Sequence, residues 1–274
     1  GSEVEQELIQ IKINLKGEVD VKHIVKASKV PGTLHLFSGK ISNLVVTNEI
    51  NEEIQSGLAN DGLGNESVLI LPSEKNSIVK YNLKNMSLKD NLFTTQIAYP
   101  ERFSVLFDKS IELIFLNENV IFLDNKKGLS INGGGNATIQ FYSNELKIIK
   151  EISWEENKFD VEIITDSNID EFNFDQESKS INFEINGENK FVTISMSEKL
   201  LGGPYVTLLN DEKIHHTKYL RDENNISLNF KPETTGQITI IGTTVIPEFS
   251  MFIPLIMGFM IILTIPFVKK INLH

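Results

Sequence analysis

Residues 111–123 read IELIFLNENVIFL, two apolar runs on either side of the short polar stretch Asn117-Glu-Asn119. Runs of four to six residues rich in Ile, Leu, Phe and Val are typical of strands. A polar interruption of three residues has the length of a tight hairpin connection. The stretch therefore predicts a β-hairpin with strands from Ile111 to Leu116 and from Val120 to Leu123.

Alternation of apolar and polar residues with period two recurs in residues 5–15, 34–47 and 159–163. Such alternation puts one side of a strand on a core and the other side in water. Turn clusters such as Gly133-Gly-Gly135 separate these segments. We therefore expect a mainly β protein with one or two Greek-key-like β-sandwich domains. The best helical signal is a single turn from Ser197 to Leu201.

The chain is expected to consist of three parts. Residues 1–165 would form an N-terminal β domain, and residues 166–245 a β-sandwich module next to the membrane. Residues 246–274 would hold a sorting motif, one transmembrane helix and a short basic tail. Almost no linker separates the module from the membrane segment.

Composition narrows the range of functions. The 274 residues are 41% hydrophobic, which is the balance of a globular chain, and they carry a formal net charge of −11. This charge argues against a nucleic-acid partner, because such proteins neutralise phosphates with Lys and Arg. The sequence has no cysteine, which excludes disulfides, thiolate catalysis and zinc–thiolate or iron–sulfur sites within it.

Residues 250–268, SMFIPLIMGFMIILTIPFV, contain no charged side chain. A run of about 20 apolar residues just spans a hydrocarbon core of ~30 Å, so the segment predicts one transmembrane helix in the lipid bilayer. Lys269 and Lys270 follow at once, whereas Glu248 precedes the segment with no Lys or Arg nearby. The positive-inside rule then places the Lys pair in the cytoplasm and the N-terminal part outside the cell.

The first residues, Gly1-Ser2-Glu3, lack the basic and apolar regions of a signal peptide. The chain is then either a mature or trimmed exported protein or a tail-anchored protein that faces the cytosol. The Lys pair after the membrane segment favours the exported form, held in the cell membrane by a single pass.

Pro247-Glu248-Phe249, followed by an apolar helix and a short basic end, resembles the PEFG-CTERM sorting segment of exported archaeal proteins, especially those of Thaumarchaeota. Ser250 stands where that family usually has Gly. The resemblance implies a cell-surface protein whose tail, with Pro247, Glu248 and Phe249 as the motif, is read by an archaeosortase-type membrane enzyme. Cleavage there would replace the helix with another anchor.

The stretch from Phe172 to Thr244 also resembles the β-rich module that often precedes such tails. Its recognisable pieces are Phe172-Asn-Phe-Asp175, Lys179-Ser-Ile-Asn-Phe183 and Ile241-Gly-Thr-Thr244. The resemblance covers about the last third of the chain. It implies a location rather than an activity.

Metal ligands are sparse in the sequence. The histidines are His23, His35, His215, His216 and His274, and a metal site would need two or three of them to converge. Adjacent residues of a strand point to opposite faces, so the pair at 215 and 216 cannot chelate there. We expect ordinary half-buried or surface histidines.

Residues 166–170 with Glu177 partly mimic a calcium-binding EF-hand loop, but Glu171 stands where glycine is needed. A strand through Phe172 and Phe174, followed by a turn, explains the pattern better. We therefore expect no cofactor, with a surface Ca²⁺ ion as the alternative.

No catalytic signature occurs in the sequence. Residues 132–135, Asn-Gly-Gly-Gly, lack the Lys-Ser/Thr of a phosphate-binding loop and are expected to connect two strands. There is no Gly-x-Ser-x-Gly or His-Glu-x-x-His motif, and we expect that the protein is not an enzyme. Four sequons offer N-glycosylation sites for an exported glycoprotein, at Asn65, Asn85, Asn136 and Asn225.

Together these features predict an exported, membrane-anchored archaeal cell-surface protein with a structural or interaction role. Its expected partners are the bilayer, the archaeosortase-type enzyme and other membrane or surface-layer proteins. One alternative is an accessory subunit of a membrane enzyme complex at its extracytoplasmic face. Another is an extracellular metal-binding protein or hydrolase.

Overall fold

The computed structural model describes residues 2–144, 146–154 and 156–245. Strands and their connections make up this part of the chain, which confirms the mainly β class. No helix in the described residues has the length and apolarity needed to cross a membrane. The expected transmembrane segment, the sorting motif and the Lys pair lie at 247–270, outside the described residues.

The described residues divide into two compact units. Unit N comprises the chain up to residue 147 together with 164–166, and unit C comprises 148–163 and the described residues from 167 onward. Each unit has its own hydrophobic core.

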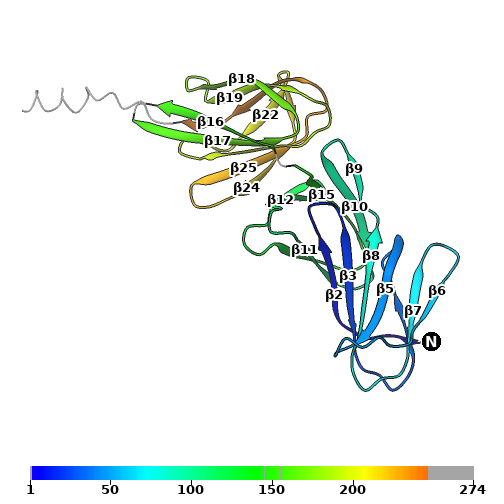
Figure 1. Ribbon diagram of the computed structural model, residues 1–274. Helices are drawn as coiled ribbons and strands as arrows, with labels where there is room; N and C mark the ends of the chain where they lie inside the picture. Colours follow the sequence, from blue (N-terminus) through cyan, green and yellow to red (C-terminus); the bar gives the residue numbers. More distant parts are fainter. Residues whose placement is uncertain (1, 145, 155, 246–274) are drawn as a thin grey trace, which may run out of the picture. The chain divides into compact units, whose positions relative to one another are not determined.

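Unit N is built from three sheets (Figure 1). In each sheet, strands named next to each other below are hydrogen-bonded neighbours. The six-stranded sheet consists of β14 (Gly128–Ile131), β11 (Phe103–Phe107), β2 (Gln6–Ile13), β3 (Val19–Val25), β8 (Ser77–Lys84) and β5 (Lys40–Asn48). The five-stranded sheet consists of β13 (Asn119–Phe122), β12 (Leu113–Leu116), β15 (Asn136–Tyr142), β10 (Leu92–Ala98) and β9 (Ser87–Lys89). The four-stranded sheet consists of β1 (Ser2–Glu3), β4 (Gly32–His35), β7 (Glu66–Ile70) and β6 (Gly57–Asn60).

Apolar side chains from all three sheets join in one core. Strand β2 shows how the sequence produces this arrangement. Ile9, Ile11 and Ile13 are buried, and they alternate with Gln10 and Lys12 on the other face. The period-two alternation in residues 5–15 therefore marks a strand with one face in the core.

The hairpin predicted from residues 111–123 is confirmed, but its first strand begins at Leu113 and Asn119 belongs to the second strand rather than to the turn. Strand β12 pairs antiparallel with β13, and Leu116 lies opposite Asn119. The two residues between the strands, Asn117 and Glu118, have φ angles of 48° and 67°. Positive φ at both central positions is the geometry of a type I′ turn, whose twist matches that of the flanking strands.

Unit C contains two five-stranded sheets, and its layers are visible in Figure 1. One consists of β16 (Lys147–Trp154), β17 (Asn157–Thr165), β20 (Val192–Ser197), β25 (Asn225–Phe230) and β24 (Thr217–Leu220). The other consists of β18 (Asn168–Asp175), β19 (Ser180–Asn186), β26 (Gly236–Ile241), β22 (Val206–Leu209) and β23 (Glu212–Ile214). Val161 and Ile194 from the first sheet and Phe183 and Ile238 from the second belong to the same buried cluster. A short pair, β21 (Leu201–Gly202) with β27 (Thr244–Val245), ends the described chain.

The helical turn expected from Ser197 to Leu201 is wrong. Ser197 ends β20, and the chain turns there into β21. The Ser197 carbonyl accepts a hydrogen bond from the Leu200 N–H at 3.0 Å, and the Ser197 hydroxyl accepts one from the Lys199 N–H at 3.2 Å. Serine side chains that bond to the nearby backbone stabilise such turns as readily as they cap helices.

The glycine run at 132–135 connects β14 to β15, as expected. Gly134 has a φ of 86°, and its N–H donates to the Tyr99 carbonyl at 2.9 Å. A Cβ added to Gly133 would lie 2.2 Å from the Pro100 carbonyl oxygen, whereas one on Gly135 would have no atom within 4 Å. The chain passes so close to its neighbour here that only glycine fits at position 133.

This close approach predicts that Gly133→Ala lowers the free energy of unfolding by about 1–3 kcal/mol, because backbone atoms must move to admit the methyl group. Gly135→Ala is the matched control and should change it by less than about 1 kcal/mol. Urea unfolding of both variants measures the difference. Equal stability of the two variants would contradict the packing described.

Candidate functional site

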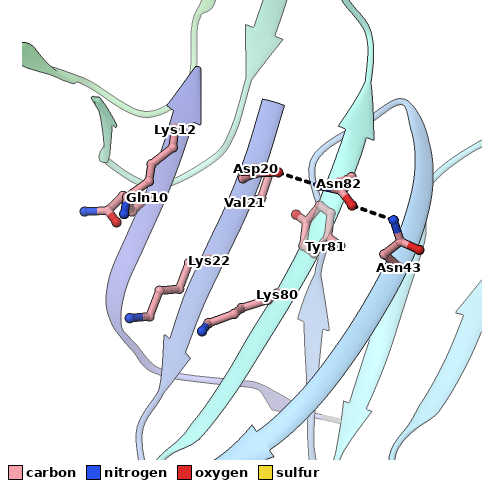
Figure 2. Close-up of a pocket in the computed structure, with 9 residues that line it drawn as sticks. All are labelled: Gln10, Lys12, Asp20, Val21, Lys22, Asn43, Lys80, Tyr81 and Asn82. Atoms are coloured by element: carbon pink, nitrogen blue, oxygen red, sulfur yellow. Dashed lines mark hydrogen bonds between the residues drawn. The ribbon is translucent and has the colours of Figure 1, made fainter. Parts of the chain in front are cut away.

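The outward face of the six-stranded sheet carries a hollow of ≈ 350 Å³, which we call the lysine groove (Figure 2). It is lined by Gln10, Lys12, Asp20, Val21, Lys22, Asn43, Lys80, Tyr81 and Asn82. These residues come from β2, β3, β8 and β5, four neighbouring strands. The polar ones occupy the positions that alternate with the buried core residues of the same strands.

Strand register brings the polar residues into two rows. Gln10 lies opposite Lys22, and Lys22 lies opposite Lys80. In the second row Lys12 lies opposite Asp20, and Asp20 lies opposite Asn82. Figure 2 shows the side chains of Lys22 and Lys80 extended in the same direction from adjacent strands.

A β-bulge shapes the end of the second row. The register of β5 against β8 shifts between Ser42 and Val45, and Asn43 there has a φ of 53°. Asparagine tolerates this left-handed conformation better than most residues. The Asn43 amide donates to Asn82 Oδ1 at 2.7 Å, and the Asn82 amide donates in turn to the Asp20 carboxylate. The bulge thus fixes the orientation of three polar side chains.

The groove is positively charged in a negatively charged protein. Three lysines and one aspartate line it, and none of Lys12, Lys22 and Lys80 makes an ion pair with any described residue. Like charges directly opposite each other in a sheet lower its stability. The Lys22–Lys80 pair therefore has no structural benefit in itself, and its ammonium groups remain available to an anion.

A buried polar network lies on the inner side of the same strands. His23 of β3 is 0% exposed, with Nδ1 2.7 Å from Gln6 Oε1 and Nε2 2.9 Å from the Tyr81 hydroxyl. Tyr81 also accepts the Phe37 N–H at 3.0 Å. The amide of Gln6 donates to the Tyr99 hydroxyl at 2.9 Å.

The partners of Gln6 determine which atoms donate and which accept in this network. The Gln6 amide nitrogen also contacts the Glu101 carboxylate at 2.8 Å, so Gln6 Oε1 must face His23. His23 Nδ1 then carries the hydrogen, and Nε2 accepts from the Tyr81 hydroxyl. Tyr99 donates to the His35 carbonyl at 2.8 Å. Every member is satisfied with His23 neutral, so the network holds the sheet together rigidly.

Burial governs the ionisation of this network. It lowers the pKa of His23 to about 4, and it raises the pKa of Tyr99 to about 12 and that of Tyr81 further. His23 and Tyr81 have no access to solvent-borne substrate, since they are 0% and 3% exposed. They are therefore structural residues that support the groove rather than a catalytic pair.

The low pKa of His23 predicts a loss of stability in acid. The unfolded chain binds a proton at this residue near its ordinary pKa of 6.5, whereas the folded chain does so only near 4. The stability that neutral His23 contributes is fully present above pH 6.5. As the pH falls from 6.5 to 4, protonation of this residue in the unfolded chain lowers the free energy of unfolding by about 3 kcal/mol. An NMR titration should show a neutral, Nδ1-protonated His23 down to about pH 5.

The exposed His35 provides the control. Its His35→Gln variant should retain the acid-dependent loss of stability, and His23→Phe should reduce it by the contribution of His23. An imidazole of His23 that titrates near 6.5 would show that the buried network is wrong.

The other histidines that the structure describes are not grouped in a metal site, and His274 lies outside the described residues. His35 Nε2 lies 3.7 Å from Glu3 Oε1 at the surface. His215 is exposed, and half-buried His216 has Nδ1 3.0 Å from the Thr207 hydroxyl. In the part of the chain that the structure describes, no three His, Asp or Glu side chains are grouped so that they could hold a metal ion. The expected strand through Phe172 and Phe174 is confirmed as β18, with a turn after it.

Comparison with known proteins adds no assignment. No family model matches the chain. No significantly similar protein is found among curated proteins either. The lysine groove is therefore interpreted from its own chemistry.

Sequence reasoning did not identify the groove. Each strand contributes only one or two of its polar residues, as in Gln10-Ile-Lys12 of β2, and such alternation looks like any solvated face. A signal did exist for His23. It stands in Val19-Asp-Val-Lys-His23-Ile-Val25, where every other residue is apolar, and that pattern places it on the buried face.

Proposed function

We propose that this protein is exported and anchored in the archaeal cell membrane by one C-terminal helix, with its β units outside the cell in a structural or interaction role. The observation that carries the proposal is the uncharged run at 250–268 with Lys269 and Lys270 directly after it. The resemblance of Pro247-Glu248-Phe249 to a sorting motif supports recognition by an archaeosortase-type enzyme.

The architecture of unit C supports the finer description of a Greek-key-like β-sandwich next to the membrane. Its two sheets share one core, and the chain passes from one sheet to the other after β17, β19, β20, β23 and β25. Extracellular modules are often sandwiches of this kind. Such a unit presents a rigid scaffold without needing disulfides.

A second candidate is an accessory subunit of a membrane enzyme complex. Strand β27 ends at Val245, and only residues 246–249 separate it from the expected helix. Unit C would then lie against the outer surface of the bilayer, where it could contact other membrane proteins. Purification in a mild detergent distinguishes the two roles, because a subunit would copurify with stoichiometric partners.

The proposed topology predicts which lysines react with a membrane-impermeant amine reagent on intact cells. Lys29, Lys75 and Lys213 are exposed on the described units and should be labelled, as read by peptide mass spectrometry. Lys269 and Lys270 should be labelled only after permeabilisation. A tail that has been processed would show instead as a new C-terminus before residue 250.

A cytosolic protein from the same cells serves as the control for leakage. Protection of Lys29 and Lys213 in intact cells would refute the extracytoplasmic location of the β units.

An exported chain would make the four sequons usable, and the structure distinguishes them. The Asn65 amide donates to Asp61 at 2.8 Å, and the Asn225 amide contacts both oxygens of Asp222. The half-buried Asn85 donates to the Gln96 carbonyl at 3.3 Å, and its Oδ1 is inaccessible. Exposed Asn136 makes no side-chain hydrogen bond with any residue that the structure describes.

We therefore predict the highest glycan occupancy at Asn136 and the lowest at Asn85, because an N-linked glycan needs an amide that projects into solvent. Glycopeptide mass spectrometry of the native protein measures both. Asn136→Gln should remove more glycan mass than the same substitution at any other sequon, and Asn85→Gln is the matched control. Dominant occupancy at Asn85 would contradict the prediction.

A further inference from the structure

We propose that the lysine groove binds a short anionic sugar, one that carries carboxylate or sulfate groups together with hydroxyls. The inference rests on the interaction role proposed above and names the ligand class for unit N. Four features of the groove support it: its charge, its amide lining, its floor and its size.

The charge of the groove is opposite to that of the whole protein. Its lining carries three lysines and one aspartate, a formal charge of +2, whereas the chain carries −11. Lys22 and Lys80 lie directly opposite each other with no carboxylate between them. An anion bound between the two ammonium groups would turn this repulsion into two favourable ion pairs.

The rest of the lining is suited to hydroxyl groups. Gln10, Asn43 and Asn82 provide amides, each of which can donate and accept, and the Asp20 carboxylate accepts. The Asn43–Asn82–Asp20 hydrogen bonds fix these groups before a ligand arrives. A bare inorganic anion would have no use for Asp20, whereas a sugar acid presents hydroxyls to it.

The floor and the size argue against a lipid and a long polyanion as the ligand. The apolar side chains of the lining, Val21 and Tyr81, are 2% and 3% exposed, so these two side chains offer little surface to a lipid chain. A volume of ≈ 350 Å³ lies at the lower end of the range for small-molecule sites. A long polyanion would also extend over the negatively charged remainder of the protein, beyond a Debye length of about 8–10 Å.

The test uses the full chain in non-ionic detergent micelles and isothermal titration calorimetry. The probes are trigalacturonate for the carboxylate source, a sulfated trisaccharide for the sulfate source, and maltotriose as the neutral sugar. We expect at least one of the two anionic probes to bind, with an affinity that falls as salt is added, and maltotriose not to bind. Which anionic probe binds identifies the charged group.

Lys22→Gln with Lys80→Gln should weaken this binding by roughly tenfold, since two exposed ion pairs are lost. Lys89→Gln with Lys109→Gln removes the same charge from exposed positions of unit N outside the groove and should leave the affinity unchanged. Urea unfolding verifies that both variants fold.

The proposal would be overturned by no binding of either anionic probe, by equal binding of maltotriose, or by equal weakening in the two double variants. Binding of anionic lipid vesicles without binding of the sugars would also overturn it. The measurement does not depend on where the protein resides, so its failure is distinct from a failure of the proposed location.

Discussion

The fully buried imidazole of His23 is the constraint on which the surface of unit N depends. It joins Gln6 of β2 to Tyr81 of β8 across the middle of the six-stranded sheet. A polar group in a core is tolerated only when all its hydrogen bonds are made, so the positions of these strands are closely specified. The same strands carry Lys22 and Lys80 on their other face. A change that disturbs the inner network would therefore displace the lysines outside.

Local patterns in the sequence were sufficient for part of the fold. The β12–β13 hairpin could be predicted because both strands and their turn are contiguous. The parallel pairing of β11 with β2 could not be predicted, because Val105 and Ile11 are far apart in the chain. Neither strand has a sequence feature that identifies the other as its neighbour. Period-two alternation identifies a strand and its buried face, but the order of strands follows from packing between distant segments.

The same limit applies to the candidate site. The polar face of β3 is evident from Asp20 and Lys22 in the sequence, but the groove exists only because β8 places Lys80 and Asn82 beside them. The bulge that turns Asn43 toward Asn82 has no signal beyond the tolerance of asparagine for positive φ. Sites of this kind combine one or two ordinary residues from each of several strands, so no single motif contains them.

The bulge in β5 has a further consequence, because β5 is the last strand of its sheet. A flat, unpaired strand edge is a template on which another chain can add a strand. Here the bulge interrupts the edge near Asn43. Farther along β5, the Val46 carbonyl already accepts a hydrogen bond from the Ile54 N–H, so this part of the edge is occupied. Molecules crowded side by side at high local density would therefore be hindered from adding strands at this edge of the sheet.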